Sequence, residues 1–210
     1  MRVVVLFSGG KDSVYSVFWA LKRGFKPILV TVKPPEYSMM FHHPNVGLTK
    51  LQAESMDLEQ IFVETTESNW REKLVETIGG LKVSGIVTGA IASEYQKKRI
   101  DSIAEELGIK SYAPIWHKGE ELLSEMLSNF EIYVTAVSAD GLGPEFLGEP
   151  FKKIADAKLP GIHMFLEGGE GETFVANAPC FKKRIIIKKW KKTWDGVRGV
   201  AEIEDACLED

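Results

Sequence analysis

Short apolar runs alternate with amphipathic segments through the first half of this 210-residue chain. Apolar runs bounded by glycine or proline predict buried strands, and a repeat of apolar residues at helical spacing predicts helices. Strands that alternate with helices build βαβ units, which form a parallel sheet covered by helices on both faces. We therefore expect an α/β fold with five parallel strands. The predicted strands cover residues 2–7, 27–32, 60–64, 84–88 and 111–113, and the predicted helices cover 13–23, 46–56, 68–78 and 93–107.

The pattern changes after about residue 117. A short helix is expected over 120–128, followed by an alternating, half-buried strand over 131–138 and a stretch rich in glycine and proline over 141–150. We therefore predict two domains, a first one over residues 1–117 and a smaller α+β domain over residues 118–210.

The end of the chain carries two oppositely charged segments. Seven of the eleven residues 182–192 are basic, and five of the residues 200–210 are acidic. Asp195-Gly196 between them is a hairpin-turn signal. The simpler interpretation is a β-hairpin whose basic and acidic strands pair. The alternative is a basic strip that meets a phosphate-rich or acidic partner.

Composition excludes several classes of protein. The net charge of −4 provides no basic field for non-specific nucleic-acid binding, so no nucleic-acid partner is expected. No apolar run approaches the roughly 20 residues of a membrane-spanning helix. Two cysteines, Cys180 and Cys207, exclude a disulfide framework and a four-cysteine zinc site. We expect a protein of the cytoplasm with no membrane partner and with reduced thiols.

The most informative segment is Ser8-Gly9-Gly10-Lys11-Asp12-Ser13, between the first predicted strand and the first predicted helix. Glycines let the backbone approach a ligand, and the amides and dipole of a helix start favour phosphate. The serine hydroxyls and the Lys11 ammonium add donors. Asp12 is suited to capping the helix or to holding a magnesium ion that itself binds phosphate. The alternative is a structural glycine turn with polar capping.

This segment resembles the PP-loop of the ATP pyrophosphatases, the adenine nucleotide α-hydrolase-like superfamily, whose members cleave ATP between the α and β phosphates. The resemblance implies ATP and Mg²⁺ as cofactors. Thr88 and Gly89 follow the fourth strand at the same sheet edge, where such folds bind ligands. The expected nucleotide-binding residues are Ser8, Gly9, Gly10, Lys11, Asp12, Ser13, His42, Thr88 and Gly89.

Further stretches resemble the diphthine–ammonia ligase family within that superfamily. Glu94 and Gly171 depart from its pattern, which more often has aspartate and an aromatic residue at these positions. The segments that carry the resemblance are residues 40–45 (MFHHPN), 88–99 (TGAIASEYQKKR), 114–116 (PIW), 122–126 (LLSEM) and 167–173 (EGGEGET).

The resemblance implies the last step of diphthamide synthesis, in which ammonium and ATP convert the carboxylate of diphthine in elongation factor 2 into an amide. Adenylation is needed because a carboxylate repels nucleophiles and has no good leaving group. The protein aligns the carboxylate with the α-phosphate and stabilises the departing pyrophosphate. Lys11 and an ion held by Asp12 are expected to stabilise pyrophosphate, and Glu170 is expected to act as base toward ammonium.

Several of the implied residues have a simpler interpretation. One interpretation of His42 and His43 is that they contact adenosine or substrate. The other is that they are chance residues of a surface loop. Glu94 stands where the helix dipole favours an acid in any case. The glutamates of residues 167–173 form a site for a cation, or only an acidic turn before a strand at 173–176. The residues expected to bind substrate are Glu94, Tyr95, Arg99, Glu167, Gly168, Gly169, Glu172 and Thr173.

Two other functions stay open at this point. PP-loop enzymes that modify tRNA adenylate a base before adding sulfur or an amine, but the thiolating members generally carry cysteine pairs, which this chain lacks. The second alternative is an ATP-binding module without catalysis. A homodimer is also left open.

Overall fold

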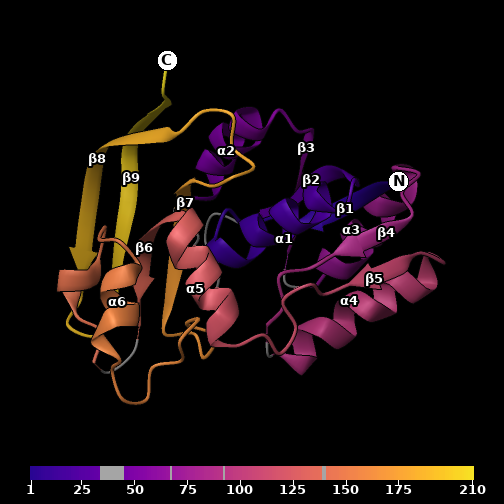
Figure 1. Cartoon of the computed structure of the whole chain (residues 1–210). Helices are drawn as coiled ribbons and strands as arrows, with labels where there is room; N and C mark the ends of the chain where they lie inside the picture. The colour runs from indigo at the N-terminus through magenta and orange to yellow at the C-terminus, as the bar shows by residue number, and fades with distance from the viewer. Residues whose placement is uncertain (34–44, 67, 92, 139–140) are drawn as a thin grey trace.

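The computed structural model describes residues 1–33, 45–66, 68–91, 93–138 and 141–210. Its first part is a parallel sheet of five strands in the order β3-β2-β1-β4-β5, which confirms the predicted α/β fold (Figure 1). The strands are β1 (Arg2–Leu6), β2 (Lys26–Lys33), β3 (Gln60–Glu64), β4 (Gly85–Val87) and β5 (Lys110–Tyr112). The helices that connect them are α1 (Lys11–Lys22), α2 (Thr49–Met56), α3 (Trp70–Gly80) and α4 (Glu94–Glu106).

Each strand buries its alternate side chains on opposite faces of the sheet. Val3 and Val5 of β1 pack in one core with α1 and α2, whereas Val4 packs in a second core with α3 and α4. Helices therefore cover both faces, as the continuous apolar runs predict. The expected start of the third helix at Ser68 is wrong, because α3 begins at Trp70 behind Asn69.

The strand order creates a crevice. From β1 the chain proceeds outward to β2 and β3 and then returns to β4, on the other side of β1. The loops that leave β1 and β4 therefore part in opposite directions at the carboxyl end of the sheet. This point of reversal is where open α/β sheets bind ligands.

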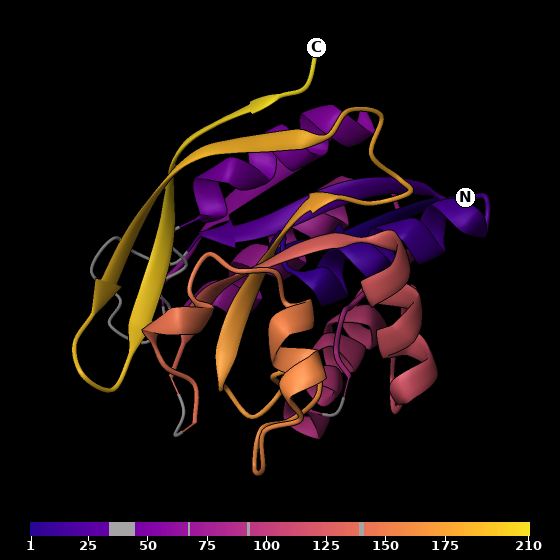
Figure 2. The same ribbon diagram turned by 60° about the vertical axis from the view of Figure 1, so that its left-hand side comes forward.

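The second part of the chain holds an antiparallel sheet in the order β7-β6-β9-β8, as expected for the α+β region. Figures 1 and 2 show α1 between this sheet and the parallel sheet. Val14 and Val17 of α1 share one core with Val134 and Val175 of the second sheet, so the two parts pack together. The boundary at residue 117 stays a prediction. The remaining elements are η1 (Val46–Leu48), α5 (Glu120–Asn129), β6 (Glu131–Val137), η2 (Pro144–Phe146), α6 (Lys152–Ala157), β7 (Gly171–Asn177), β8 (Ile185–Trp194) and β9 (Gly199–Leu208).

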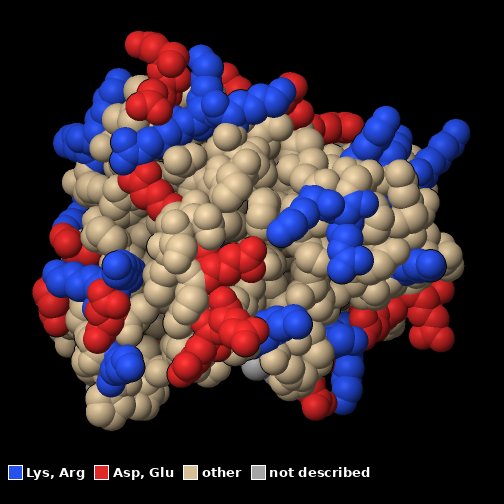
Figure 3. Space-filling view, in the orientation of Figure 1, with Lys and Arg blue, Asp and Glu red and all other residues tan. Residues whose placement is uncertain are grey.

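Strands β8 and β9 form the hairpin that the charge pattern predicts. Lys189 lies 2.6 Å from Glu204, and Lys191 lies 3.8 Å from Glu202 across the pair. Basic and acidic side chains are mixed along this side of the molecule (Figure 3). The paired-strand interpretation is confirmed, because the basic strand finds acidic partners within the chain. None of the helices in the described ranges is long and apolar enough to cross a membrane.

Candidate active site

A cavity of about 350 Å³ lies at the carboxyl ends of β1 and β4. Its walls come from the β1–α1 loop, from the β4–α4 loop with the start of α4, and from the loop that precedes β7. The lining residues are Leu6, Ser8, Gly10, Lys11, Asp12 and Ser13; Thr88, Gly89, Ala90, Ser93 and Gln96; and Leu166, Glu167, Gly169, Gly171, Glu172 and Thr173. The first sheet and the C-terminal region thus build one cavity together.

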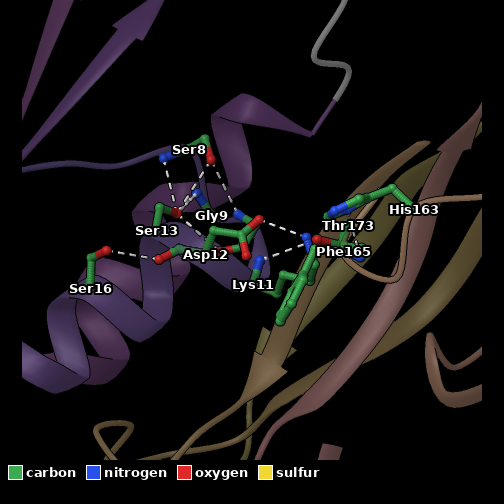
Figure 4. Close-up of polar contacts among 10 residues, drawn as sticks. Ser8, Gly9, Lys11, Asp12, Ser13, Ser16, His163, Phe165 and Thr173 are labelled. Atoms are coloured by element: carbon green, nitrogen blue, oxygen red, sulfur yellow. Dashed lines mark hydrogen bonds and ion pairs between the residues drawn. The ribbon is translucent and has the colours of Figure 1, made fainter. Parts of the chain in front are cut away.

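The predicted nucleotide-binding loop, residues 8–13, here called the nucleotide loop, is shaped by the hydroxyl of Ser13 (Figure 4). Ser13 Oγ accepts hydrogen bonds from the amides of Ser8 at 3.3 Å and Gly9 at 3.1 Å, and donates to the Gly10 carbonyl at 3.0 Å. Gly9 has φ +81°, a conformation that favours glycine. The Ser13 side chain therefore holds the loop in a closed turn, and the outer edge of this turn faces the cavity.

Lys11 and Asp12 form a partly buried ion pair, with 2.6 Å between Nζ and Oδ2. The Lys11 side chain is only 4% exposed. Its ammonium also lies 5.7 Å from the ring centroid of Phe151 and 5.8 Å from that of Phe165. Aromatic faces attract a cation, most strongly where water is excluded. A carboxylate and two rings therefore compensate this ammonium.

Burial raises the pKa of Asp12 above its ordinary value, while the charge of Lys11 and the hydrogen bond from it act in the opposite direction. Asp12 Oδ1 is buried and has no hydrogen-bond partner among the described residues. An unpartnered buried carboxylate oxygen beside the predicted phosphate-binding loop suits a cation. Magnesium usually binds one or two carboxylates together with phosphate oxygens and water, so a single aspartate is a sufficient protein ligand. Asp12 therefore fits the expected metal role.

The C-terminal region contacts the nucleotide loop directly. Thr173 Oγ1 accepts a hydrogen bond from the Lys11 amide at 3.2 Å, and the Val175 amide donates to the Gly9 carbonyl at 3.2 Å. Strand β7 therefore lies along the loop. Thr173, expected to bind substrate, holds the first turn of α1 as well as lining the cavity.

Thr88 and Gly89 line the opposite wall. A Cβ on Gly89 would lie 2.9 Å from the backbone carbon and 3.0 Å from the carbonyl oxygen of Asp12, and 3.1 Å from the Ser13 amide nitrogen. These atoms belong to the first turn of α1 and cannot move aside singly. Glycine at this position therefore lets the loop after β4 pack against the start of α1.

Some residues of the acidic loop, residues 167–172, line the cavity, and others lie behind it and support the loop. Glu167, Gly169 and Glu172 line the cavity, whereas Gly168 and Glu170 do not. Glu170 is buried, and its Oε1 accepts a hydrogen bond from the His163 amide at 2.8 Å. Its Oε2 is buried without a partner in the described part of the chain. A Cβ on Gly168 would lie 2.8 Å from the Glu170 carboxylate, so that glycine makes room for it.

Helix α4 presents other residues to the cavity than those expected. Ser93, whose hydroxyl caps the helix by accepting from the Gln96 amide, lines the cavity together with Gln96. Glu94 pairs with Lys98 at 3.0 Å, outside the lining set. Serine at a helix start followed by glutamine three residues later is a capping signal, which could have identified this pair from sequence.

Tyr95 and Arg99 lie on the outer side of the same helix. The Arg99 guanidinium carbon lies 4.0 Å from the centroid of the Tyr95 ring and 5.0 Å from that of Trp70. Tyr95 is 64% exposed. Both residues therefore belong to a surface beside the cavity and not to its lining.

Two further expectations and one omission complete the comparison with the sequence. His42 and His43 lie outside the described residues. Gly9 supports the nucleotide loop but does not line the cavity. Phe151 and Phe165, which flank Lys11, were missed, since nothing local in the sequence distinguishes them from other core phenylalanines.

All three buried side-chain atoms that lack a partner in the described ranges belong to Asp12, Gln52 and Glu170. Buried polar groups are nearly always satisfied, and exceptions cluster where a ligand or ion completes the set. Asp12 lines the cavity, Gln52 contacts the nucleotide loop, and Glu170 lies between two cavity-lining glycines. All three therefore lie in the cavity wall or directly behind it, which makes the cavity the candidate functional site.

Known sequences resemble the whole chain. The family described as the diphthamide synthase N-terminal domain matches residues 1–111, and the diphthamide synthase C-terminal domain matches residues 118–208. The diphthine–ammonia ligases of Bos taurus and Homo sapiens are each 32% identical over 223 residues, covering 89% of this chain and 83% of each relative.

Among solved structures, a predicted subunit of tRNA methyltransferase from Methanocaldococcus jannaschii superposes with a TM-score of 0.51 at 18% identity. The match covers 85% of this chain and 98% of that one, and at this identity it shows a shared fold alone. The two matched domains together span nearly the entire sequence, including the nucleotide loop and the acidic loop. The chain therefore belongs to the diphthamide synthase family.

Proposed function

We propose that this protein is an ATP-dependent ligase that amidates diphthine in elongation factor 2, with ammonium as the nitrogen source and AMP and pyrophosphate as products. The observation that carries the proposal is the single cavity into which both the nucleotide loop and the acidic loop open. A reaction that joins a nucleotide-activated carboxylate to a cationic nitrogen source needs these two environments side by side.

The chemistry has two steps. A carboxylate oxygen of diphthine attacks the α-phosphorus of ATP, the bond to the β-phosphate oxygen breaks, and pyrophosphate leaves. Ammonia then attacks the acyl carbon, the bond to the AMP oxygen breaks, and a proton is released. No side-chain nucleophile is required, and burial raises the pKa of the Cys180 thiol to about 12, which makes it inert.

In this proposal Lys11 stabilises the negative charge that develops on pyrophosphate. Its ammonium is already at the cavity wall, held by Asp12 and two rings. A preorganised charge in a dry site costs little reorganisation during the reaction. Asp12 would hold Mg²⁺, which supplies further positive charge to the phosphates.

The acidic loop is proposed to receive ammonium. Glu167 and Glu172 line the cavity and give it the negative charge that attracts a cation. We keep Glu170 as the proposed base that takes a proton from ammonium. Support comes from its carboxylate, in which Oε1 is used in a hydrogen bond and Oε2 is buried without a partner in the described residues.

The exposed surface formed by Glu94, Tyr95 and Arg99 is proposed to contact the protein substrate. It lies on α4, whose N-cap Ser93 and first-turn residue Gln96 line the cavity. A folded protein that inserts a modified side chain into the cavity would cover this part of the helix. The cytoplasm as the location of the protein, and a homodimer, stay predictions from the sequence.

The test is incubation of the protein with ATP, Mg²⁺, ammonium and elongation factor 2 that carries diphthine. AMP and pyrophosphate should form only when the modified factor is present, and the factor should lose one carboxylate and gain one amide by mass spectrometry. AMP formation that depends on tRNA, or ADP as product, would refute the proposal. Tight ATP binding without turnover would favour an ATP-binding module.

A further inference from the structure

Gln52 is a fully buried residue of α2 that no active-site expectation included. Its side-chain Nε2 donates one hydrogen bond to the Gly9 carbonyl at 2.9 Å and a second to the Val175 carbonyl at 2.8 Å. These acceptors lie 43 and 123 residues away in the sequence. One amide group thus connects the nucleotide loop with strand β7.

The orientation of this amide follows from its partners. Both acceptors are carbonyl oxygens, which cannot donate, so the nitrogen must face them. The Gly9 carbonyl also accepts from the Val175 amide at 3.2 Å. Two donors, one from α2 and one from β7, therefore fix the direction in which this carbonyl points.

The direction of the Gly9 carbonyl determines that of the next amide. A trans peptide is planar, and its N–H points opposite to its C=O. While Gln52 and β7 hold the Gly9 oxygen on their side, the Gly10 N–H is turned to the other side of the loop. Gly10 lines the cavity, and its amide has only a long contact of 3.4 Å to Ser8 Oγ. This amide is available to a phosphate oxygen.

The glycine at position 9 belongs to the same arrangement. A Cβ there would lie 2.4 Å from Gln52 Oε1 and 2.9 Å from Thr49 Cγ2. The Gly9 backbone therefore lies directly against the Gln52 amide, with no room for any other residue. The contact is close enough for a change at Gln52 to be transmitted to the loop.

We propose that Gln52 is a positioning residue that sets the Gly9–Gly10 peptide so that the Gly10 N–H faces the phosphates of ATP. It acts through the loop and does not touch the nucleotide. The inference depends on one part of the proposed function, namely that the cavity binds ATP.

The test compares Gln52→Met with Gln60→Met. Each substitution removes two hydrogen bonds. Gln52 loses those to the Gly9 and Val175 carbonyls, and Gln60 Nε2 loses those to Thr31 Oγ1 and Thr49 Oγ1, both at 2.8 Å. Melting temperature, the Kd for ATP with Mg²⁺ by calorimetry, and KM against kcat are measured on the full chain. For Gln52→Met we expect the Kd and the KM for ATP to rise about tenfold or more, the scale of one or two hydrogen bonds. For Gln60→Met both should stay within about twofold.

Two results would overturn the inference: an unchanged Kd in Gln52→Met, or an equal rise in Kd in both variants, which would mean that the effect is general destabilisation. If Gln52→Met does not fold, Gln52→Leu removes the same two donors with a shorter apolar side chain, and the same rise in Kd is expected. Wild-type protein that binds no ATP would instead refute the proposed function, and the inference with it.

Discussion

The ammonium of Lys11 lies 2.6 Å from the carboxylate of its neighbour Asp12, and the cavity is lined by both. The pair has one further property, an Oδ1 atom on Asp12 that no described residue contacts by hydrogen bond. Taking the Lys11 ammonium out of water is costly, and the Asp12 carboxylate beside it offsets part of that cost. In the proposed mechanism, Lys11 would exchange Asp12 for a phosphate group, and Asp12 would exchange Lys11 for a cation.

Replacing Lys11 by methionine should lower pyrophosphate release by about 100-fold or more, as expected when a group that stabilises developing charge is lost. Lys22→Met is the control, because Lys22 is exposed at the other end of α1 and lies over the ring of Phe18. Steady-state pyrophosphate release measures both variants. Equal activity of Lys11→Met and Lys22→Met would contradict the role of Lys11.

Gly89→Ala should reduce both stability and ATP binding, since its Cβ would come within about 3 Å of the backbone of Asp12. We expect a loss of about 1–3 kcal/mol in the free energy of unfolding from such overpacking. Gly47→Ala is the matched control, because a Cβ at Gly47 meets nothing within 4 Å. Denaturant unfolding and ATP titration of both variants check this, and a Gly89→Ala protein with wild-type behaviour would show that the two loops are not tightly packed.

Phe165→Leu should raise the KM for ATP about five- to thirtyfold, the scale of a desolvated cation–π contact with Lys11. Phe165→Tyr retains the aromatic face and should restore most of the affinity. Phe146→Leu is the control, since Phe146 is buried and carries Lys153 at 5.8 Å, away from the cavity. If leucine and tyrosine at position 165 gave the same KM in folded protein, the ring would only fill space.

The substitution Glu170→Gln tests whether Glu170 acts as a general base or only positions the acidic loop. Glutamine can still accept the His163 amide through Oε1 but cannot take a proton from ammonium. If Glu170 is the base, amide formation should fall about 100-fold, within the range for general bases, with the Kd for ATP unchanged. Near-normal turnover would exclude the base role and leave Glu170 as the residue that positions the loop through His163.

A pH-dependent contribution to stability is expected from Glu131 and Arg184, which are joined by two hydrogen bonds of 2.6 Å. The hydrogen bonds from Arg184 lower the pKa of Glu131 below its ordinary value of 4.5. A lowered carboxyl pKa stabilises the folded state above the unfolded pKa, and this stabilisation disappears as the pH falls through the folded pKa. The pair is partly exposed, so we expect less than about 1 kcal/mol.

Melting temperatures of wild type and Glu131→Gln, measured from pH 7 down to pH 3, test this. The wild type should be the more stable at pH 7, and the difference should shrink below about pH 4.5. A difference that is constant across this range would mean that the charge of Glu131 does not contribute.

Periodicity was sufficient for most of the fold, because each helix and strand of the parallel sheet buries a face whose spacing is visible in the sequence. Gln60–Glu64 matches its predicted bounds. Helix starts were less well predicted: α3 begins at Trp70 although Ser68 is the better capping residue, and α1 begins at Lys11, inside the nucleotide motif. Local capping preference is weak compared with the packing that fixes where a helix leaves its strand.

The sequence by itself determined the α/β sheet, the position of the proposed phosphate-binding loop after β1, and the family, since all three depend on local spacing and contiguous motifs. Only the tertiary structure decided which side chains line the cavity. It selected Ser93 and Gln96 in place of Glu94 and Tyr95, and it brought Gln52 and Val175 to the Gly9 carbonyl. These contacts join residues far apart in the chain, and no local pattern records them, because they depend on how the second sheet packs against the first.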